Sequence, residues 1–377
     1  MQTIADLYKN DLPEDAIFVL EYPTSYKENF GNPSFLVNSS RYLLDDEFRD
    51  HDYESNRIEK PHRNLAVLGG GVRAYVAEPP SPLLLAHWQK KLGDKVEVRY
   101  GDLGEQVPHV CLFPLQDLPP ELHAVDPDIH FHVYSKNFIG DINCPQAAIL
   151  PEPKLPCVLK VSRSSGGHGT WIIEKEEDYD YWMACISNTM PYAETVLTEL
   201  VQEVKYSFCC HLYVNRRGEL TWIGVTEKIM DEHNIWIGAV VNLSKQEEWE
   251  RLLRATTEPV VEALHAKGYF GMLGVDVLVD EQGKQFVIDI NPRILGSTPL
   301  ILAAPELQKR GWDVGIFLTG VMCKDATTEA LIYKADEAKN GEMVIYSMVN
   351  RDDAIACQIG VFAKTLADCK AIAEAFY

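Results

Sequence analysis

Short apolar runs separated by turns and amphipathic segments extend along the whole chain, a pattern typical of α/β proteins. Residues 1–130 alternate such runs with helical stretches such as 83–92, which predicts a βαβ-like domain. Towards the other end, the runs 344–349 and 354–362 predict strands, and residues 366–376 predict an amphipathic helix. These C-terminal elements contain no motif that indicates chemistry.

Two predicted strands contain acids among their apolar residues. Asp276 lies in the first strand and Asp289 in the second, and the turn 280–283 joins the two strands into a predicted hairpin. Asn291 follows Asp289 by two positions, so both side chains leave the same face of the second strand. An unpaired buried carboxylate is costly, but two carboxylates and an amide suit Mg²⁺. The alternative is a core hairpin with one surface-facing acid on each strand.

A second motif lies more than a hundred residues earlier. The apolar strand 156–161 contains Lys160, and it leads through the Gly- and Ser-rich loop 162–170 into another short strand at 171–173. Such a loop offers many backbone N–H groups that can approach an anion closely, and the lysine adds a charge for a phosphate. The loop is not a P-loop, because no Gly-Lys-Ser/Thr ends it and a strand follows. The alternative is a loose surface hairpin.

Together, in this order and spacing, the two motifs resemble those of the ATP-grasp superfamily, over roughly residues 136–322. The resemblance implies an α/β fold (α+β lobes), namely the ATP-grasp fold with an N-terminal Rossmann-like domain. The expected divisions are an N-terminal substrate-wall domain, a small lobe with the Gly-rich loop, a large lobe with the metal site, and C-terminal elements that complete the large lobe. Their expected ranges are 1–130, 131–200, 201–325 and 326–377.

The resemblance also implies which residues bind ATP. Lys136 and Lys160 match the two nucleotide lysines, the Gly-rich loop would cover the β- and γ-phosphates, and apolar side chains would pack on the adenine. These residues are Lys136, Val158, Lys160, Ser164, Ser165, Gly166, Gly167, His168, Gly169 and Leu278. The hinge that would bond the adenine edge has two registers, led by Glu199 or by Gln202. Its residues are Glu199, Leu200, Val201, Gln202 and Glu203.

In the same way the resemblance implies a metal site and two catalytic cations. Asp276, Asp289 and Asn291 would hold one or two Mg²⁺ ions, which Mn²⁺ can replace. Lys228 would meet the terminal phosphate, and Arg293 would face the substrate and the transferring phosphoryl group. Many superfamily members carry Glu where this chain has Asp289, and the shorter side chain favours single coordination over bridging two ions.

The implied reaction joins two small molecules. A carboxylic acid, expected to be an amino acid, is activated as an acyl phosphate and then coupled to an amine, with release of ADP and phosphate. One alternative within the fold uses bicarbonate, as carboxylases and carbamoyl-phosphate-forming enzymes do. The other is an NAD(P)-dependent oxidoreductase or a nucleotide-binding protein without turnover. Assembly as a homodimer stays open.

Charge and cysteine content limit the partners. The formal net charge is −21, which argues against nucleic acid and anionic membranes and requires Mg²⁺ and local lysines to offset the repulsion of ATP. The nine cysteines show no metal-ligand spacing and are expected to be reduced thiols. No apolar stretch is long enough to span a membrane, and the start lacks a signal pattern, so we expect a cytoplasmic protein.

Several local patterns allow further expectations. Residues 68–74 loosely match G-x-G-x-x-A after a predicted strand, but without a suitable acid we favour a tight strand-to-helix turn over a dinucleotide site. Residues 230–239 predict a lid loop with Trp236 at its tip. Residues 244–247 predict a capping box that opens a helix. His130 and His132 are expected on one face of an extended segment, as structural histidines.

Overall fold

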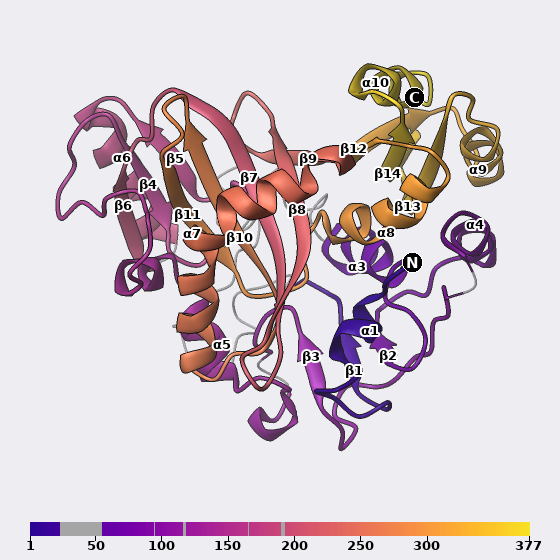
Figure 1. Ribbon diagram of the computed structural model, residues 1–377, viewed down its shortest axis with the longest axis horizontal. Helices are drawn as coiled ribbons and strands as arrows, with labels where there is room; N and C mark the ends of the chain where they lie inside the picture. The colour runs from indigo at the N-terminus through magenta and orange to yellow at the C-terminus, as the bar shows by residue number, and fades with distance from the viewer. Residues whose placement is uncertain (23–54, 94, 116–117, 165, 190–192) are drawn as a thin grey trace.

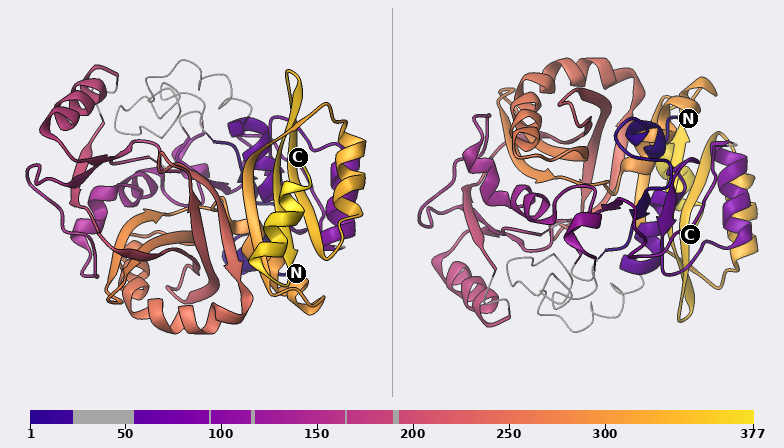
Figure 2. Two further views of the ribbon diagram at one scale, coloured as in Figure 1. Left: turned by 90° about the horizontal axis from the view of Figure 1, so that it is seen from above. Right: turned by 90° about the horizontal axis from the view of Figure 1, so that it is seen from below.

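The computed structural model describes residues 1–22, 55–93, 95–115, 118–164, 166–189 and 193–377 (Figure 1). Its strands form three sheets, one of eight strands and two of three strands. The strands between residues 157 and 199 and the C-terminal strands lie at opposite ends of the molecule, with most of the large sheet between them (Figure 2). Ser165, one of the predicted nucleotide residues, lies outside the described residues.

The N-terminal sheet is parallel and has the order β2-β1-β3. Its strands are β1 Ile17–Val19, β2 Arg73–Tyr75 and β3 His109–Cys111. The helical segments around it are α1 Ile4–Tyr8, η4 Ser55–Glu59, α3 Lys60–Leu65, α4 Pro82–Leu92, η5 Pro120–Leu122 and α5 Pro127–Val133. A parallel sheet with intervening helices is what the alternating pattern predicts.

Two expectations about this segment are wrong. Leu65 ends helix α3, and the glycines 69–71 lead into strand β2, so the turn runs from helix to strand. A dinucleotide fingerprint needs the opposite order, and the basis for a nicotinamide site is therefore absent from this turn. His130 and His132 lie in α5, not in an extended segment, because Asp126 caps the backbone N–H groups of residues 128 and 129 and Pro127 occupies the first helical position.

The small lobe contains the second three-stranded sheet, with the antiparallel order β5-β4-β6. Its elements are η6 Lys136–Asp141, β4 Cys157–Val161, β5 Thr170–Ile173, α6 Glu176–Thr189 and β6 Thr195–Glu199. The Gly-rich loop joins β4 to β5, as the sequence predicts. Only a small cluster of apolar side chains lies under this sheet, around Leu159 and Ile173.

The large sheet is antiparallel, in the order β11-β10-β7-β8-β9-β12-β14-β13. Its strands are β7 Val204–Val214, β8 Leu220–Met230, β9 Trp236–Asn242, β10 Gly271–Asp280, β11 Gln285–Asn291, β12 Val314–Lys324, β13 Gly341–Arg351 and β14 Ala354–Ala363. The accompanying helices are η7 Leu243–Lys245, α7 Gln246–Ala266, α8 Thr298–Lys309, α9 Thr328–Asp336 and α10 Leu366–Glu374. The two predicted C-terminal strands thus extend the same sheet.

Two local predictions in this lobe are also wrong. The expected lid at 230–239 is shorter, since β8 ends at Met230 and Trp236 already belongs to β9. Helix α7 begins without the predicted capping box, and no side chain caps it. Gln246 explains the change: its side-chain amide accepts from the Val225 N–H and donates to the Val225 carbonyl, which ties the helix start to β8.

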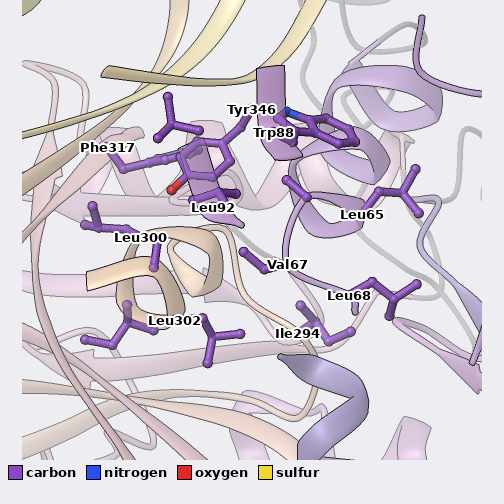
Figure 3. Packing of buried hydrophobic residues seen from close by; sticks show 14 of the residues in the cluster. Leu65, Val67, Leu68, Trp88, Leu92, Ile294, Leu300, Leu302, Phe317 and Tyr346 are labelled. Atoms are coloured by element: carbon purple, nitrogen blue, oxygen red, sulfur yellow. The ribbon is translucent and has the colours of Figure 1, made fainter. Parts of the chain in front are cut away.

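The main hydrophobic core joins segments from both ends of the chain. The residues after α3, the start of α8 and the C-terminal strands share one cluster (Figure 3). Trp88 from α4 is fully buried there and donates its indole N–H to the Ile345 carbonyl. Burying a Trp side chain contributes several kcal/mol. This packing places α3 beside the end of β11, where the predicted metal-site residues lie.

No helix in the described ranges has the length and apolar character needed to cross a membrane. All nine cysteines are free thiols, as their spacing predicts. Cys209 and Cys210 are adjacent in β7 and fully or almost fully buried. Burial raises the pKa of both thiols, so neither is suited to act as a thiolate.

Candidate functional site

A cavity of about 1030 Å³ is lined by the small-lobe sheet, the large sheet and residues 22, 59, 60 and 63 of the N-terminal segment. This volume lies at the upper end of the roughly 300–1,000 Å³ of ordinary ligand sites. Among the described residues, seven cationic and four acidic side chains line it. The cations are Lys60, Arg63, Lys136, Lys160, Lys228, Arg293 and Arg351, and the acids are Glu59, Glu199, Asp276 and Asp289. A positive cavity in a chain of net charge −21 indicates anionic ligands.

The predicted hairpin forms one wall of this cavity, with the expected register. Asp276 of β10 pairs directly with Asp289 of β11, and Asn291 pairs with Gly274. All three polar side chains line the cavity. They come together because neighbouring strands hold directly opposed residues about 5 Å apart.

Each of the three polar side chains contacts a cation. Asp276 accepts from Lys228 at 2.9 Å, and Asp289 lies 3.5 Å from the Lys136 ammonium. The Asn291 amide oxygen accepts from Arg293 at 3.0 Å. The oxygen donors fit Mg²⁺, which prefers one or two carboxylates together with phosphate and water oxygens. In the described part of the chain no group of three His, Cys, Asp or Glu side chains could hold a metal, so the third protein ligand would be the amide.

Three of the four cavity lysines, Lys136, Lys160 and Lys228, differ in their environments. Burial lowers the pKa of Lys160 to about 8, and its ammonium donates to the Ile288 carbonyl at 3.0 Å. Burial also lowers the pKa of Lys136, against the opposing effect of Asp289. For Lys228, burial is outweighed by Asp276, which raises the pKa. Of the three lysines, Lys160 would therefore gain most in its protonated fraction when a phosphate binds beside it.

The Gly-rich loop lies against the turn between β8 and β9. The Trp236 N–H donates to the Gly166 carbonyl at 2.9 Å, and a Cβ on Gly167 would lie 2.1 Å from the Asn234 carbonyl oxygen. Lys136 donates to the Ser164 carbonyl at 2.5 Å, which ties the loop to the lysine cluster. Among the described residues of the predicted loop 162–170, those that line the cavity are Ser164, Gly166, Gly167, His168 and Thr170, which begins β5. Gly169 does not line it; its carbonyl accepts from Val161 and closes the hairpin.

The opposite end of the cavity is more apolar and includes part of the predicted hinge. Val158 and Leu278, the predicted adenine contacts, both line it. So do Glu199, Leu200 and Val201, whereas Gln202 and Glu203 do not. The Glu203 carbonyl instead accepts from the Glu281 N–H. Of the two hinge registers, the one led by Glu199 is the one that borders the cavity.

Beyond Arg293 lies a polar network that sequence reasoning missed. Three hydrogen bonds connect η4, α3, β13 and β14. Arg351 and Gln358 both donate to the Glu59 carboxylate, at 2.8 and 3.3 Å, and Arg63 donates to the Gln358 side-chain oxygen at 3.3 Å. Arg63 and Arg293 both donate to the Tyr22 hydroxyl. These residues belong to no recognisable motif, and the packing of α3 against the C-terminal strands brings the two sequence-distant groups together. The missed cavity residues are Tyr22, Glu59, Lys60, Arg63, Arg351 and Gln358.

Part of this chain is similar in sequence to known proteins. The ATP-grasp family described as L-aspartate–L-methionine ligase matches residues 143–291, which include the hinge and hairpin. A [butirosin acyl-carrier protein]–L-glutamate ligase from Niallia circulans is 28% identical over 189 residues, which cover 48% of this chain and 43% of that relative. The match therefore spans less than half the length of this curated relative.

Solved structures agree in fold along almost the whole chain. N5-carboxyaminoimidazole synthetase from Staphylococcus aureus, determined with ADP, has a TM-score of 0.56 at 11% identity, with 97% of each chain covered. The L-amino acid ligase from Bacillus licheniformis has a TM-score of 0.52 at 11% identity, again with 97% of each chain covered. At such low identity these likenesses concern the fold. With the family model that matches residues 143–291 and the two motifs in their expected places, they show that the chain has an ATP-grasp fold.

Proposed function

We propose that this protein is an ATP-dependent carbon–nitrogen ligase that activates a carboxylic acid as an acyl phosphate and couples it to an amine. The observation that carries the proposal is the opposed pair Asp276–Asp289 with Asn291 beside it, facing three lysines and a Gly-rich loop across one cavity. The named relatives support an amino acid as the acid, since their descriptions specify L-aspartate, L-methionine and L-glutamate.

In this proposal residues 1–130 form a wall of the substrate site, 131–200 and 201–325 enclose the nucleotide, and 326–377 complete the large lobe. Val158, Leu278 and the backbone of residues 199–201 would hold the adenine. Lys136, Lys160 and the loop residues 164–168 would bind the phosphates, and Lys228 would meet the terminal one. Asp276, Asp289 and Asn291 would hold Mg²⁺, which supplies charge neutralisation for phosphoryl transfer.

The chain's own residues then act by positioning and by excluding water. Arg293 would steer the substrate carboxylate to the terminal phosphorus, where a carboxylate oxygen forms the new bond and ADP leaves. The amine next attacks the acyl carbon, phosphate leaves, and the amine gives up a proton. Because an acyl phosphate hydrolyses readily, the contact between the Gly-rich loop and the β8–β9 turn would protect it. No side chain serves as a nucleophile.

The test is ADP release with Mg²⁺ and ATP, together with mass spectrometry of the products. We expect ADP only when an amino-acid mixture is present, and a product mass equal to two substrates minus water. Parallel reactions contain bicarbonate without amino acids, or a nicotinamide cofactor. ADP release that depends on bicarbonate alone, or absorbance change with the nicotinamide, would contradict the ligase proposal.

The variant Asp289→Asn tests the site itself. It keeps the side-chain shape but removes the charge, so ADP formation should fall on the order of 100-fold and require more Mg²⁺. Asp289→Glu is the matched control, because it restores the carboxylate that many superfamily members have here, and it should retain much of the activity. Equal activity of Asp289→Asn and the wild type would exclude Asp289 from the metal site.

A further inference from the structure

Arg63 is a buried cation in the cavity without a carboxylate partner. It is 3% exposed, on helix α3, and its guanidinium donates to Gln358 at 3.3 Å and to the Tyr22 hydroxyl at 3.4 Å. Its Nε has no hydrogen-bond partner, and within the described residues Arg63 forms no ion pair with an acid. The nearest acid in the network, Glu59, already accepts from Arg351 and Gln358.

Further cations lie close to Arg63. Arg293 donates to the same Tyr22 hydroxyl at 3.0 Å. Burial and Arg293 both lower the pKa of Arg63, while Tyr22 and, more weakly, the Glu59 carboxylate oppose them. Although burial alone would raise the pKa of Tyr22, the cations Arg293, Arg63 and Lys60 hold it below its usual value. A buried charge without a partner costs several kcal/mol, so this cluster fits an anion that comes from a ligand.

Other residues suffice for the anions that the proposed reaction already needs. The lysines 136, 160 and 228 face the phosphate end, and Arg293 lies next to Asn291, where the reacting carboxylate is expected. Arg63 is therefore an additional cation. Gly296 lets it approach the site, since a Cβ there would lie 2.6 Å from the Trp236 ring and 3.4 Å from an Arg63 nitrogen.

We infer that Arg63 binds a second carboxylate, one that is not phosphorylated. This inference rests on the proposed ligase function. Two substrates can supply such a group: an acid substrate with two carboxylates, or an amino acid that serves as the amine and keeps its own carboxylate. A guanidinium binds a carboxylate through two parallel N–H donors, which fixes orientation as well as charge. Arg63 would thus select carboxylate-bearing substrates over their amides.

Substrate pairs test the inference and separate the two sources. The first pair is L-aspartate and L-asparagine as the acid, and the second is L-methionine and L-methioninamide as the amine. In the wild type we expect kcat/KM to favour the carboxylate in one of the pairs by at least about tenfold, the value of a charged hydrogen bond. Arg63→Gln should abolish that preference, and Arg63→Lys should restore part of it. The pair that responds identifies the source of the carboxylate.

Folding and the proposed function are controlled separately. Titration calorimetry with ATP should give the same Kd for Arg63→Gln and the wild type within about twofold, because the hydrogen bonds of Arg63 go to Gln358 and Tyr22 and not to the lysine cluster. The inference is overturned if the wild type prefers neither carboxylate, or if Arg63→Gln slows all four substrates equally and leaves the preferences intact. If the wild type releases no ADP with any amino acid, the ligase proposal fails instead.

Discussion

At the scale of single residues, the candidate site consists of polar groups that already partner one another. The Asp276 carboxylate and the Lys228 ammonium pair at 2.9 Å, and Asn291 accepts from Arg293. Such pairs offset the cost of burying charge, and they can be exchanged when ligands bring charges of their own. Lys160 differs, because its hydrogen bond goes to a neutral carbonyl, that of Ile288. Its protonation is therefore the most sensitive to a bound phosphate.

This difference predicts how ATP affinity depends on pH. With a pKa of about 8 in the free protein, Lys160 is charged below pH 8 and loses its proton above it. A bound phosphate favours the charged amine and raises its pKa, so binding above pH 8 must take up a proton. The Kd for ATP should be nearly constant from pH 6 to 7.5 and then rise up to about tenfold per pH unit, as measured by titration calorimetry.

The variant Lys160→Arg provides the control, because a guanidinium stays charged throughout this range. Its affinity for ATP should be weaker overall, owing to the different shape, but should lose the rise above pH 8. An equally steep rise in wild type and variant would assign the titration to another group.

At the scale of elements, the Gly-rich loop packs directly against the β8–β9 turn. The loop touches the turn through backbone atoms, with Gly166 accepting from Trp236 and Gly167 lying under the Asn234 carbonyl. Close backbone approach of this kind requires glycine, because any Cβ would overlap the facing carbonyl. The sequence of the loop thus sets how closely it can approach the turn.

The variant Gly167→Ala tests this contact. Its new Cβ would lie 2.1 Å from the Asn234 oxygen, so the loop must move away from the turn. We expect a higher KM for ATP and more phosphate release without amide product, because water can reach the acyl phosphate. The ratio of phosphate to amide product measures this directly.

Gly166→Ala is the matched control. Gly166 also has a positive φ, +69°, so alanine costs about 1 kcal/mol there as well, but its nearest neighbour atom would be 3.7 Å away. It should therefore keep the coupling of phosphate release to amide formation. Equal uncoupling in both variants would mean that backbone strain, and not the contact with the turn, controls closure.

The same scale shows what the sequence can and cannot predict. The β10–β11 hairpin follows from local patterns, because alternation and a short turn together fix the register that opposes Asp276 and Asp289. The capping box at 244–247 failed because the Gln246 side chain binds β8, a partner that no local pattern reveals. Arg63 lay beyond prediction for the same reason: its hydrogen-bond partner Gln358 is 295 positions away.

At the scale of the whole molecule, the charge of the surface opposes that of the cavity. The chain carries a net charge of −21, yet the cavity is lined by more cations than acids. ATP approaching from a distance meets the field of the whole molecule, and only near the opening does it meet the lysines. The Debye length falls from about 30 Å at 0.01 M salt to about 8 Å at 0.15 M, so added salt screens the distant repulsion first.

The balance of these two fields predicts an unusual salt dependence. Raising KCl from 0.01 to 0.15 M at constant Mg²⁺ should increase kcat/KM for ATP by roughly two- to tenfold, because the remote acids are screened while the buried lysines are screened much less. Sucrose at equal osmolality should leave kcat/KM unchanged, since a neutral solute does not screen charge. A steady fall over the same range would show that the cationic cavity, and not the acidic surface, governs the approach of ATP.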